Sequence, residues 1–188
     1  KRKLKISLNK VLVQIGYSAA ESQQHLKILG EFKNLPLDTK QKLVLFIPLS
    51  YGGSSDYIEI VSKKVLETGI ECLLQKEFLT DYEILERESV SDFLICVRES
   101  DVGNASLIEF IYLGKLVIAG SWLPYKMYEH AGIFFENVEN IESLVTLIPK
   151  LVEDLNNVKL NCKNNKERLL SIYDSDFITK NWCHVYLD

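Results

Sequence analysis

The strongest constraint on the fold is a repeated alternation between short apolar runs and stretches with helical periodicity. Runs rich in β-branched residues predict strands at 11–15, 42–49, 70–74, 91–97 and 116–119, with a short sixth at 133–135. Helices are expected between them, at 22–32, 56–68, about 80–90 and 105–113. Strands that alternate with helices form a parallel sheet covered on both faces. The sequence therefore predicts an α/β, Rossmann-like, doubly wound domain of about six strands.

Local signals mark the ends of these helices and the limits of the domain. Gly69 and Gly114 predict helix C-termini, and Thr80 with Glu83 predicts a capping box. Residues 34–39 contain Pro36 and are expected to form a loop. We expect a linker or edge segment over 1–10, the Rossmann-like domain over 11–150, and C-terminal helices of the same domain over 151–188.

Composition excludes several classes of protein. The 188 residues are 47% hydrophobic, enough for one domain with a real core. A net charge of −4 provides no basic field for nucleic acid, and no apolar run approaches the roughly 18 residues of a membrane span. The four cysteines and three histidines lack metal-ligand spacing, so no metal site is expected. Without a secretory signal, we expect a cytoplasmic protein with reduced cysteines.

The chain begins at Lys1, without a methionine, in a basic run that extends to Lys5. This start is typical of a piece of a longer protein. The basic run predicts a solvated linker or edge strand, and a membrane-surface patch is the alternative.

The loop after the first strand carries the first candidate ligand contacts. In open parallel sheets, ligands bind outside the carboxyl ends of the strands. Gly16, Tyr17 and Ser18 begin a small-residue loop that leads into a helix, an arrangement suited to phosphate. It is neither a G-x-G-x-x-G nor a P-loop motif. The alternative is an ordinary turn in which Ser22 is the helix N-cap.

The loop after the second strand reads Ser50-Tyr51-Gly52-Gly53-Ser54. Paired glycines allow a close approach of the backbone, and Tyr51 could stack on a base or a sugar. A plain turn is the alternative interpretation.

The loop after the fourth strand concentrates polar residues. Arg98, Glu99 and Asp101 lie at its mouth and are candidate sugar contacts. Gly103 and Asn104, candidate contacts for a diphosphate or sugar, then precede a mostly apolar helix.

The helix after that loop carries Ser106 in its first turn and Glu109 in its second. A carboxylate on a mostly buried helix usually has a partner, so we expect Glu109 to bind ribose hydroxyls. A solvated helix residue is the alternative.

These residues resemble the C-terminal, donor-binding domain of GT-B glycosyltransferases. The Gly16 loop is similar to the G-G-S loop of the peptidoglycan lipid-linked N-acetylglucosamine transferase. Gly103, Ser106 and Glu109 match its G-x-x-[ST]-x-x-E segment, with Gly114 following. The resemblance implies that Ser18 and the Ser106 region lie near a donor diphosphate and that Glu109 binds ribose.

The stretch G-Y-S-A-A-E-S-Q-Q-H also resembles the G-N-S-x-x-x-S-N-N-H loop of glycosyltransferase family 56, with Ser18, Ser22 and His25 at matching positions. That family transfers 4-acetamido-4,6-dideoxygalactose from a dTDP donor in enterobacterial common antigen synthesis. His25 is accordingly a candidate phosphate or sugar contact, with helix packing as the alternative.

The resemblance implies a bacterial cell-envelope glycosyltransferase fragment that binds a dTDP- or UDP-linked sugar as its substrate. The acceptor, lipid-linked or a saccharide, and the catalytic base would belong to a missing N-terminal domain. No cofactor is implied, and the full-length enzyme could act at the inner face of the membrane. The alternatives are a non-catalytic nucleotide-sugar-binding or protein-binding module and a nucleotide-sugar epimerase of the same fold.

Overall fold

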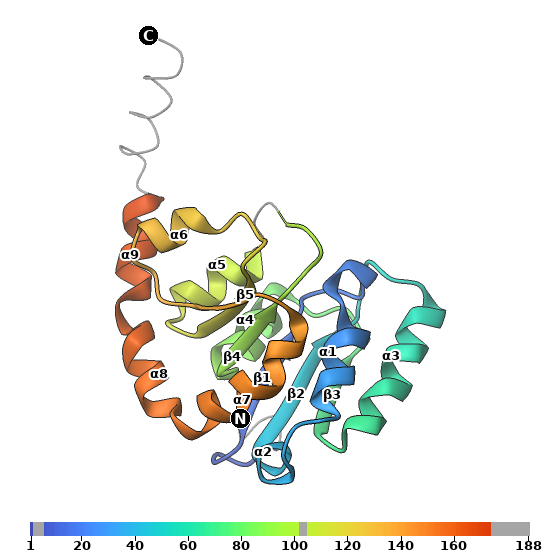
Figure 1. Cartoon of the computed structure of the whole chain (residues 1–188). Helices are drawn as coiled ribbons and strands as arrows, with labels where there is room; N and C mark the ends of the chain where they lie inside the picture. Colours follow the sequence, from blue (N-terminus) through green and yellow to red (C-terminus); the bar gives the residue numbers. More distant parts are fainter. Residues whose placement is uncertain (2–5, 102–104, 174–188) are drawn as a thin grey trace.

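The computed structural model describes residues 1, 6–101 and 105–173. Its centre is a parallel sheet of six strands in the order β3-β2-β1-β4-β5-β6 (Figure 1). The strands are β1 Val11–Ile15, β2 Leu43–Pro48, β3 Glu71–Gln75, β4 Phe93–Cys96, β5 Leu116–Gly120 and β6 Glu136–Val138. The strand order reverses direction between β1 and β4, which makes this a doubly wound, Rossmann-like sheet and confirms the predicted fold class.

Helices cover both faces of the sheet (Figure 1). Helices α1, α3 and α7 pack on one face, and α4, α5 and α9 pack on the other. The α-helices are α1 His25–Phe32, α2 Leu37–Lys42, α3 Ser55–Thr68, α4 Asp81–Val90, α5 Ala105–Tyr112, α6 Lys126–His130, α7 Leu144–Glu153, α8 Leu155–Asn161 and α9 Asn165–Ile172. Short 3₁₀ turns are η2 Glu21–Gln23, η3 Ile141–Ser143 and η4 Cys162–Asn164.

The core follows from the two-residue period of the strands. Val11 and Val13 of β1 face α1 and α3, whereas Leu12 between them faces the opposite layer beside α4. Because both faces are covered, every residue of β1 is buried, and the strand reads as a continuous apolar run apart from Gln14. No helix in the described ranges combines the length and apolarity needed to cross a bilayer.

The predicted helix-end signals are confirmed. Gly69 caps α3 in the left-handed conformation, with φ of 68°. Thr80 and Glu83 form a reciprocal capping box at the start of α4. Gly114, with φ of 65°, follows the end of α5.

Three local predictions are wrong. Residues 37–39 of the predicted loop 34–39 belong to α2, because Pro36 lies directly before the first turn, where its missing N–H costs nothing. The sixth strand is Glu136–Val138 rather than 133–135, since Ile133 packs beside α6. The first helix begins at His25 and not at Ser22, because Gln24 adopts a left-handed backbone with φ of 61° that separates η2 from α1.

A buried carboxylate stabilises the amino end of the sheet. Asp92, just before β4, accepts a hydrogen bond from the backbone N–H of Leu12 in β1 at 3.0 Å. Lys1 and Lys159 place their Nζ atoms 2.7 Å and 2.9 Å from the same carboxylate. Burial acts to raise the pKa of Asp92, but these hydrogen bonds outweigh it and hold the pKa below its usual range. Asp92 thus links the two central strands to α8.

Candidate functional site

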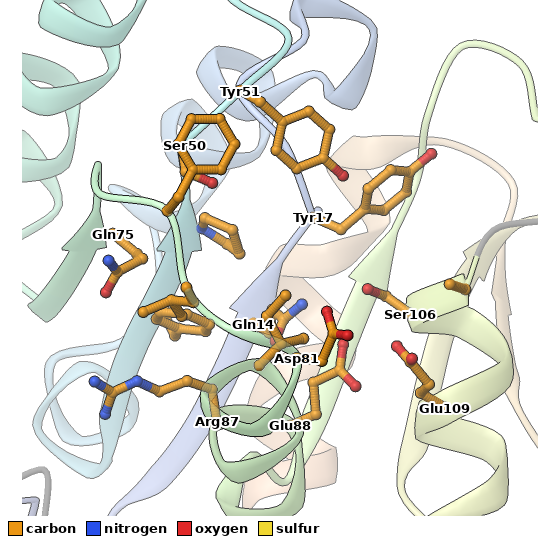
Figure 2. A pocket seen from close by; sticks show the side chains of 16 residues that line it. Gln14, Tyr17, Ser50, Tyr51, Gln75, Asp81, Arg87, Glu88, Ser106 and Glu109 are labelled. Atoms are coloured by element: carbon orange, nitrogen blue, oxygen red, sulfur yellow. The ribbon is translucent and has the colours of Figure 1, made fainter.

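A cavity of about 310 Å³ opens at the carboxyl side of the sheet between α4 and α5 (Figure 2). We call it the switch-point pocket because it lies beside β1, where the strand order reverses. Its lining includes Gln14, Tyr17, Phe46, Pro48, Ser50, Tyr51, Gln75, Phe78, Leu79, Asp81, Ile84, Arg87, Glu88, Ala105, Ser106 and Glu109. The first strands of the sheet supply one wall, and the two helices supply the other.

Aromatic rings form one side of the pocket. Tyr51, in the loop after β2, and Phe78, in the loop after β3, stack with ring centroids 6.4 Å apart and planes 14° apart. Both side chains are exposed, so their rings remain accessible from the pocket mouth. Flat, partly exposed aromatic surfaces are suited to a planar ring or the apolar face of a sugar.

Carboxyl and hydroxyl groups form the other side of the pocket. Ser106 and Glu109 extend from α5 toward the carboxyl group of Glu88 on α4 (Figure 2). Glu88 is only 1% exposed. Burial, reinforced by the charge of Glu109, raises the pKa of Glu88 to about 8. Glu88 therefore keeps its proton at neutral pH beside the Glu109 carboxylate.

Arg98 connects the loops that follow β1 and β4. Its guanidinium donates to the hydroxyl of Tyr17 and, at 3.1 Å, to the hydroxyl of Ser22. The same group lies 5.2 Å above the Tyr17 ring and 3.5 Å from the Asp101 carboxylate. Asp101 also accepts a hydrogen bond of 2.6 Å from Tyr125. The Arg98 guanidinium is thereby held at the carboxyl edge of the sheet, next to the switch-point pocket.

The loop after β1 packs tightly against the loop after β2. The backbone N–H of Ala19 donates to the carbonyl of Tyr51 at 2.7 Å. Gly53 approaches Ala19 so closely that a Cβ atom on Gly53 would lie 2.3 Å from the Ala19 carbonyl oxygen. Gly16 and Gly52 have φ angles of 63° and 83°, which favour glycine. These contacts position Tyr51 relative to Tyr17.

The structure changes the interpretation of Ser18 and Ser22. Ser18 is buried, and its hydroxyl accepts hydrogen bonds from Gln23 at 3.2 Å and from the backbone of Ala20 at 3.4 Å. These hydrogen bonds stabilise the conformation of the loop after β1. The N-cap alternative for Ser22 is wrong, because Ser22 lies inside η2 and its hydroxyl accepts from Arg98.

His25 occupies the core rather than the sheet edge. It is fully buried, and its Nδ1 atom lies 3.2 Å from the hydroxyl of Tyr57 on α3. Burial lowers the pKa of His25 to about 4. The packing alternative therefore describes His25 in this structure, and we do not include it among the ligand contacts.

We expect His25 to make the fold sensitive to acid. Its pKa is about 4 in the folded state and near 6.5 in an unfolded chain, so the unfolded state binds the extra proton between these values. Its stabilising contribution is complete above pH 6.5 and is lost as the pH falls to 4, by roughly 3 kcal/mol. Chemical denaturation at several pH values should show that His25→Leu flattens this dependence, whereas His130→Leu, at an exposed site, leaves it unchanged. Equal acid sensitivity in both variants would contradict the assignment.

Some of the residues predicted from the sequence line the pocket, and others lie elsewhere. Tyr17, Tyr51, Ser106 and Glu109 line it together. Glu99 instead lines a separate, shallow hollow with Gln24, Lys27 and Trp122. Gly103 and Asn104 lie outside the described residues.

Phe78 and Glu88 are among the lining residues that were not predicted from the sequence. Phe78 follows the third strand, so the same rule that pointed to Tyr51 could have found it. Within residues 1, 6–101 and 105–173, no group of three or more His, Cys, Asp or Glu side chains is arranged to hold a metal ion.

No protein-family model matches this chain, and no curated protein is detectably similar in sequence. Solved structures share its fold. A glycosyltransferase from Rickettsia africae has a TM-score of 0.78 at 16% identity, covering 98% of this chain and 49% of its own. HepE from Anabaena, solved with UDP-glucose, has a TM-score of 0.72 at 15% identity and covers 98% of this chain and 50% of its own.

The C-terminal domain of LpcC, a glycosyl transferase group 1 family protein from Francisella tularensis, matches with a TM-score of 0.73 at 13% identity. That match covers 93% of this chain and 91% of the Francisella domain. The chain thus spans about half the length of the first two structures and nearly all of the third. The likeness establishes the Rossmann-like fold of a GT-B domain. The finer resemblance to family 56 and to the peptidoglycan transferase stays a prediction.

Proposed function

We propose that this chain is the donor-binding domain of a glycosyltransferase and that the switch-point pocket holds the nucleoside of a nucleotide sugar. The observation that carries the proposal is the convergence of Tyr51, Phe78, Ser106 and Glu109 on one cavity beside the reversal of strand order. Ligands of open α/β sheets bind at this point. HepE, which shares the fold, was solved with UDP-glucose.

Each part of a nucleoside diphosphate has a complementary surface in this arrangement. The base would lie against the rings of Tyr51 and Phe78. The ribose hydroxyls would donate hydrogen bonds to the Glu109 carboxylate. The diphosphate would then extend toward the loop after β1 and the Arg98 guanidinium, where positive charge is available.

The chemistry of such a domain consists of positioning the donor and stabilising the departing diphosphate. Arg98 and nearby backbone N–H groups would stabilise the negative charge that develops as the sugar–phosphate bond breaks. We assign no catalytic base to this chain. The acceptor, lipid-linked or a saccharide, would be bound by another domain, and the donor would be linked to UDP or dTDP without a required metal. Action at the inner face of a membrane belongs to the same proposal.

Calorimetric titration of the protein with UDP, dTDP, ADP and inorganic pyrophosphate tests the proposal. We expect UDP or dTDP to bind with a Kd between about 10 µM and 1 mM, at least tenfold more tightly than pyrophosphate, because the nucleoside supplies most of the contacts. Equal affinity for pyrophosphate and all nucleotides would contradict it. Hydrolysis or epimerisation of UDP-glucose without an acceptor would instead support the epimerase alternative.

A further inference from the structure

The buried carboxyl group of Glu88 has no role in the contacts described so far. Glu88 lies in the last turns of α4, and each of its carboxyl oxygens is buried without a hydrogen-bond partner in the described part of the chain. Figure 2 shows the group directed toward Ser106 and Glu109 on α5. A buried polar group without a hydrogen-bond partner raises the free energy of the folded state, so the position of Glu88 requires a physical explanation.

The charges around Glu88 favour its neutral form. Glu109 faces it from α5, Asp81 lies on its own helix, and Tyr17 reaches the pocket from the loop after β1. Among the described residues no lysine or arginine forms an ion pair with Glu88. The side chain of the adjacent Arg87 extends away from it (Figure 2). A buried carboxyl without a cation is stabilised by keeping its proton.

A protonated carboxyl can donate one hydrogen bond, and the neighbouring Glu109 carboxylate is a charged acceptor for it. We propose that Glu88 is a positioning residue of the nucleotide site, whose carboxyl proton is shared with the Glu109 carboxylate and fixes that carboxylate for the ribose hydroxyls. The proposal rests on the proposed function of the pocket. It adds a residue that acts through Glu109 without touching the nucleotide.

The arrangement makes nucleotide affinity depend on pH in a defined direction. Burial and the Glu109 charge raise the pKa of Glu88 to about 8, so the proton is lost between pH 7 and 9. Loss of the proton removes the donor that orients Glu109 and places a second negative charge beside it. Both changes oppose binding of an anionic nucleotide. Affinity should therefore fall as the pH rises through this range.

The test is a titration of the protein with UDP-glucose at pH 7, 8 and 9. UDP-glucose is chosen because its phosphates do not change charge in this range. For the unmodified protein we expect Kd to rise roughly tenfold from pH 7 to 9, the size of one lost charge-assisted hydrogen bond. Glu88→Gln keeps a neutral donor, so it should bind within about threefold of the unmodified protein at pH 7 and show almost no pH dependence. Glu88→Leu lacks a donor, so at all three pH values its Kd should be roughly tenfold higher than the Kd of the unmodified protein at pH 7.

Glu153→Gln, on the exposed side of α7, is the matched control and should reproduce the unmodified protein. A Glu88→Gln variant that keeps the full pH dependence would overturn the role of Glu88, even if Glu88→Leu does not fold. Absence of binding by UDP-glucose, UDP and dTDP alike would instead reject the proposed function, and the role of Glu88 with it. The two failures are therefore distinguishable.

Discussion

Replacing Glu109 with alanine should lower the affinity for UDP or dTDP by about ten- to a hundredfold, because it would remove the charge-assisted hydrogen bond that we propose for the ribose, worth ~1.5–3 kcal/mol. Glu109 is half-buried on α5, and its backbone is part of a regular helix. Alanine favours helix, so the fold should tolerate the change. Calorimetric titration with the preferred nucleotide gives the loss directly.

A matched variant separates this effect from a general loss of negative charge. Glu153→Ala removes a carboxylate from the end of α7, on the opposite face of the sheet from α5. We expect its nucleotide affinity to equal that of the unmodified protein. If a folded Glu109→Ala protein also bound normally, Glu109 would have only a structural role and the ribose assignment would be rejected.

Gly53→Ala should distort the pocket through a steric effect alone. The new Cβ atom would lie 2.3 Å from the Ala19 carbonyl oxygen and 2.8 Å from the Ala19 Cβ, so the backbone of one loop must move. We expect a loss of roughly 1–3 kcal/mol in the free energy of unfolding, as for overpacked sites. Displacement of Tyr51 should also weaken nucleotide binding by at least about tenfold. Thermal melts and titrations measure the two losses separately.

Gly30→Ala provides the control for this substitution. Gly30 lies inside α1, and a Cβ atom there would have no neighbour within 4 Å. Alanine should therefore stabilise the helix by roughly 0.5–1 kcal/mol and leave nucleotide binding unchanged. Normal binding by both glycine variants would show that the contact between Gly53 and Ala19 does not position the pocket.

Much of the architecture could be predicted because the signals are local. β1 was predicted at its observed limits, since five consecutive buried residues between polar segments have few other solutions. The capping box at Thr80 and the left-handed Gly69 likewise depend only on neighbouring residues. Two of the three errors arose where tertiary contacts decided the outcome. The left-handed Gln24, which delays α1, occurs where its side chain donates to the Val97 carbonyl across the sheet edge.

The site was predictable only where residues follow strands directly. Tyr51 was proposed from the strand-end rule and Glu109 from a carboxylate on the mostly apolar helix after the fourth strand, and both line one pocket. Glu88 could not be found in this way, because it lies two turns into a helix and meets Glu109 only through the packing of α4 against α5. For His25 the sequence left a ligand contact and helix packing open, and the first turn of α1 directs the side chain inward to Tyr57.

The contacts of Asp92 with Leu12, Lys1 and Lys159 affect how the sequence of such a domain can diverge. Asp92 connects β1, β4 and α8 at the amino end of the sheet, whereas the loops that line the switch-point pocket lie at the carboxyl end. Substitutions that alter ligand preference therefore fall on loops that contribute little to the contacts between the strands at the amino end of the sheet. A lineage can exchange those loops one by one without first having to rebuild the scaffold. Solved structures that keep this fold at 13–16% identity are the outcome expected from that separation.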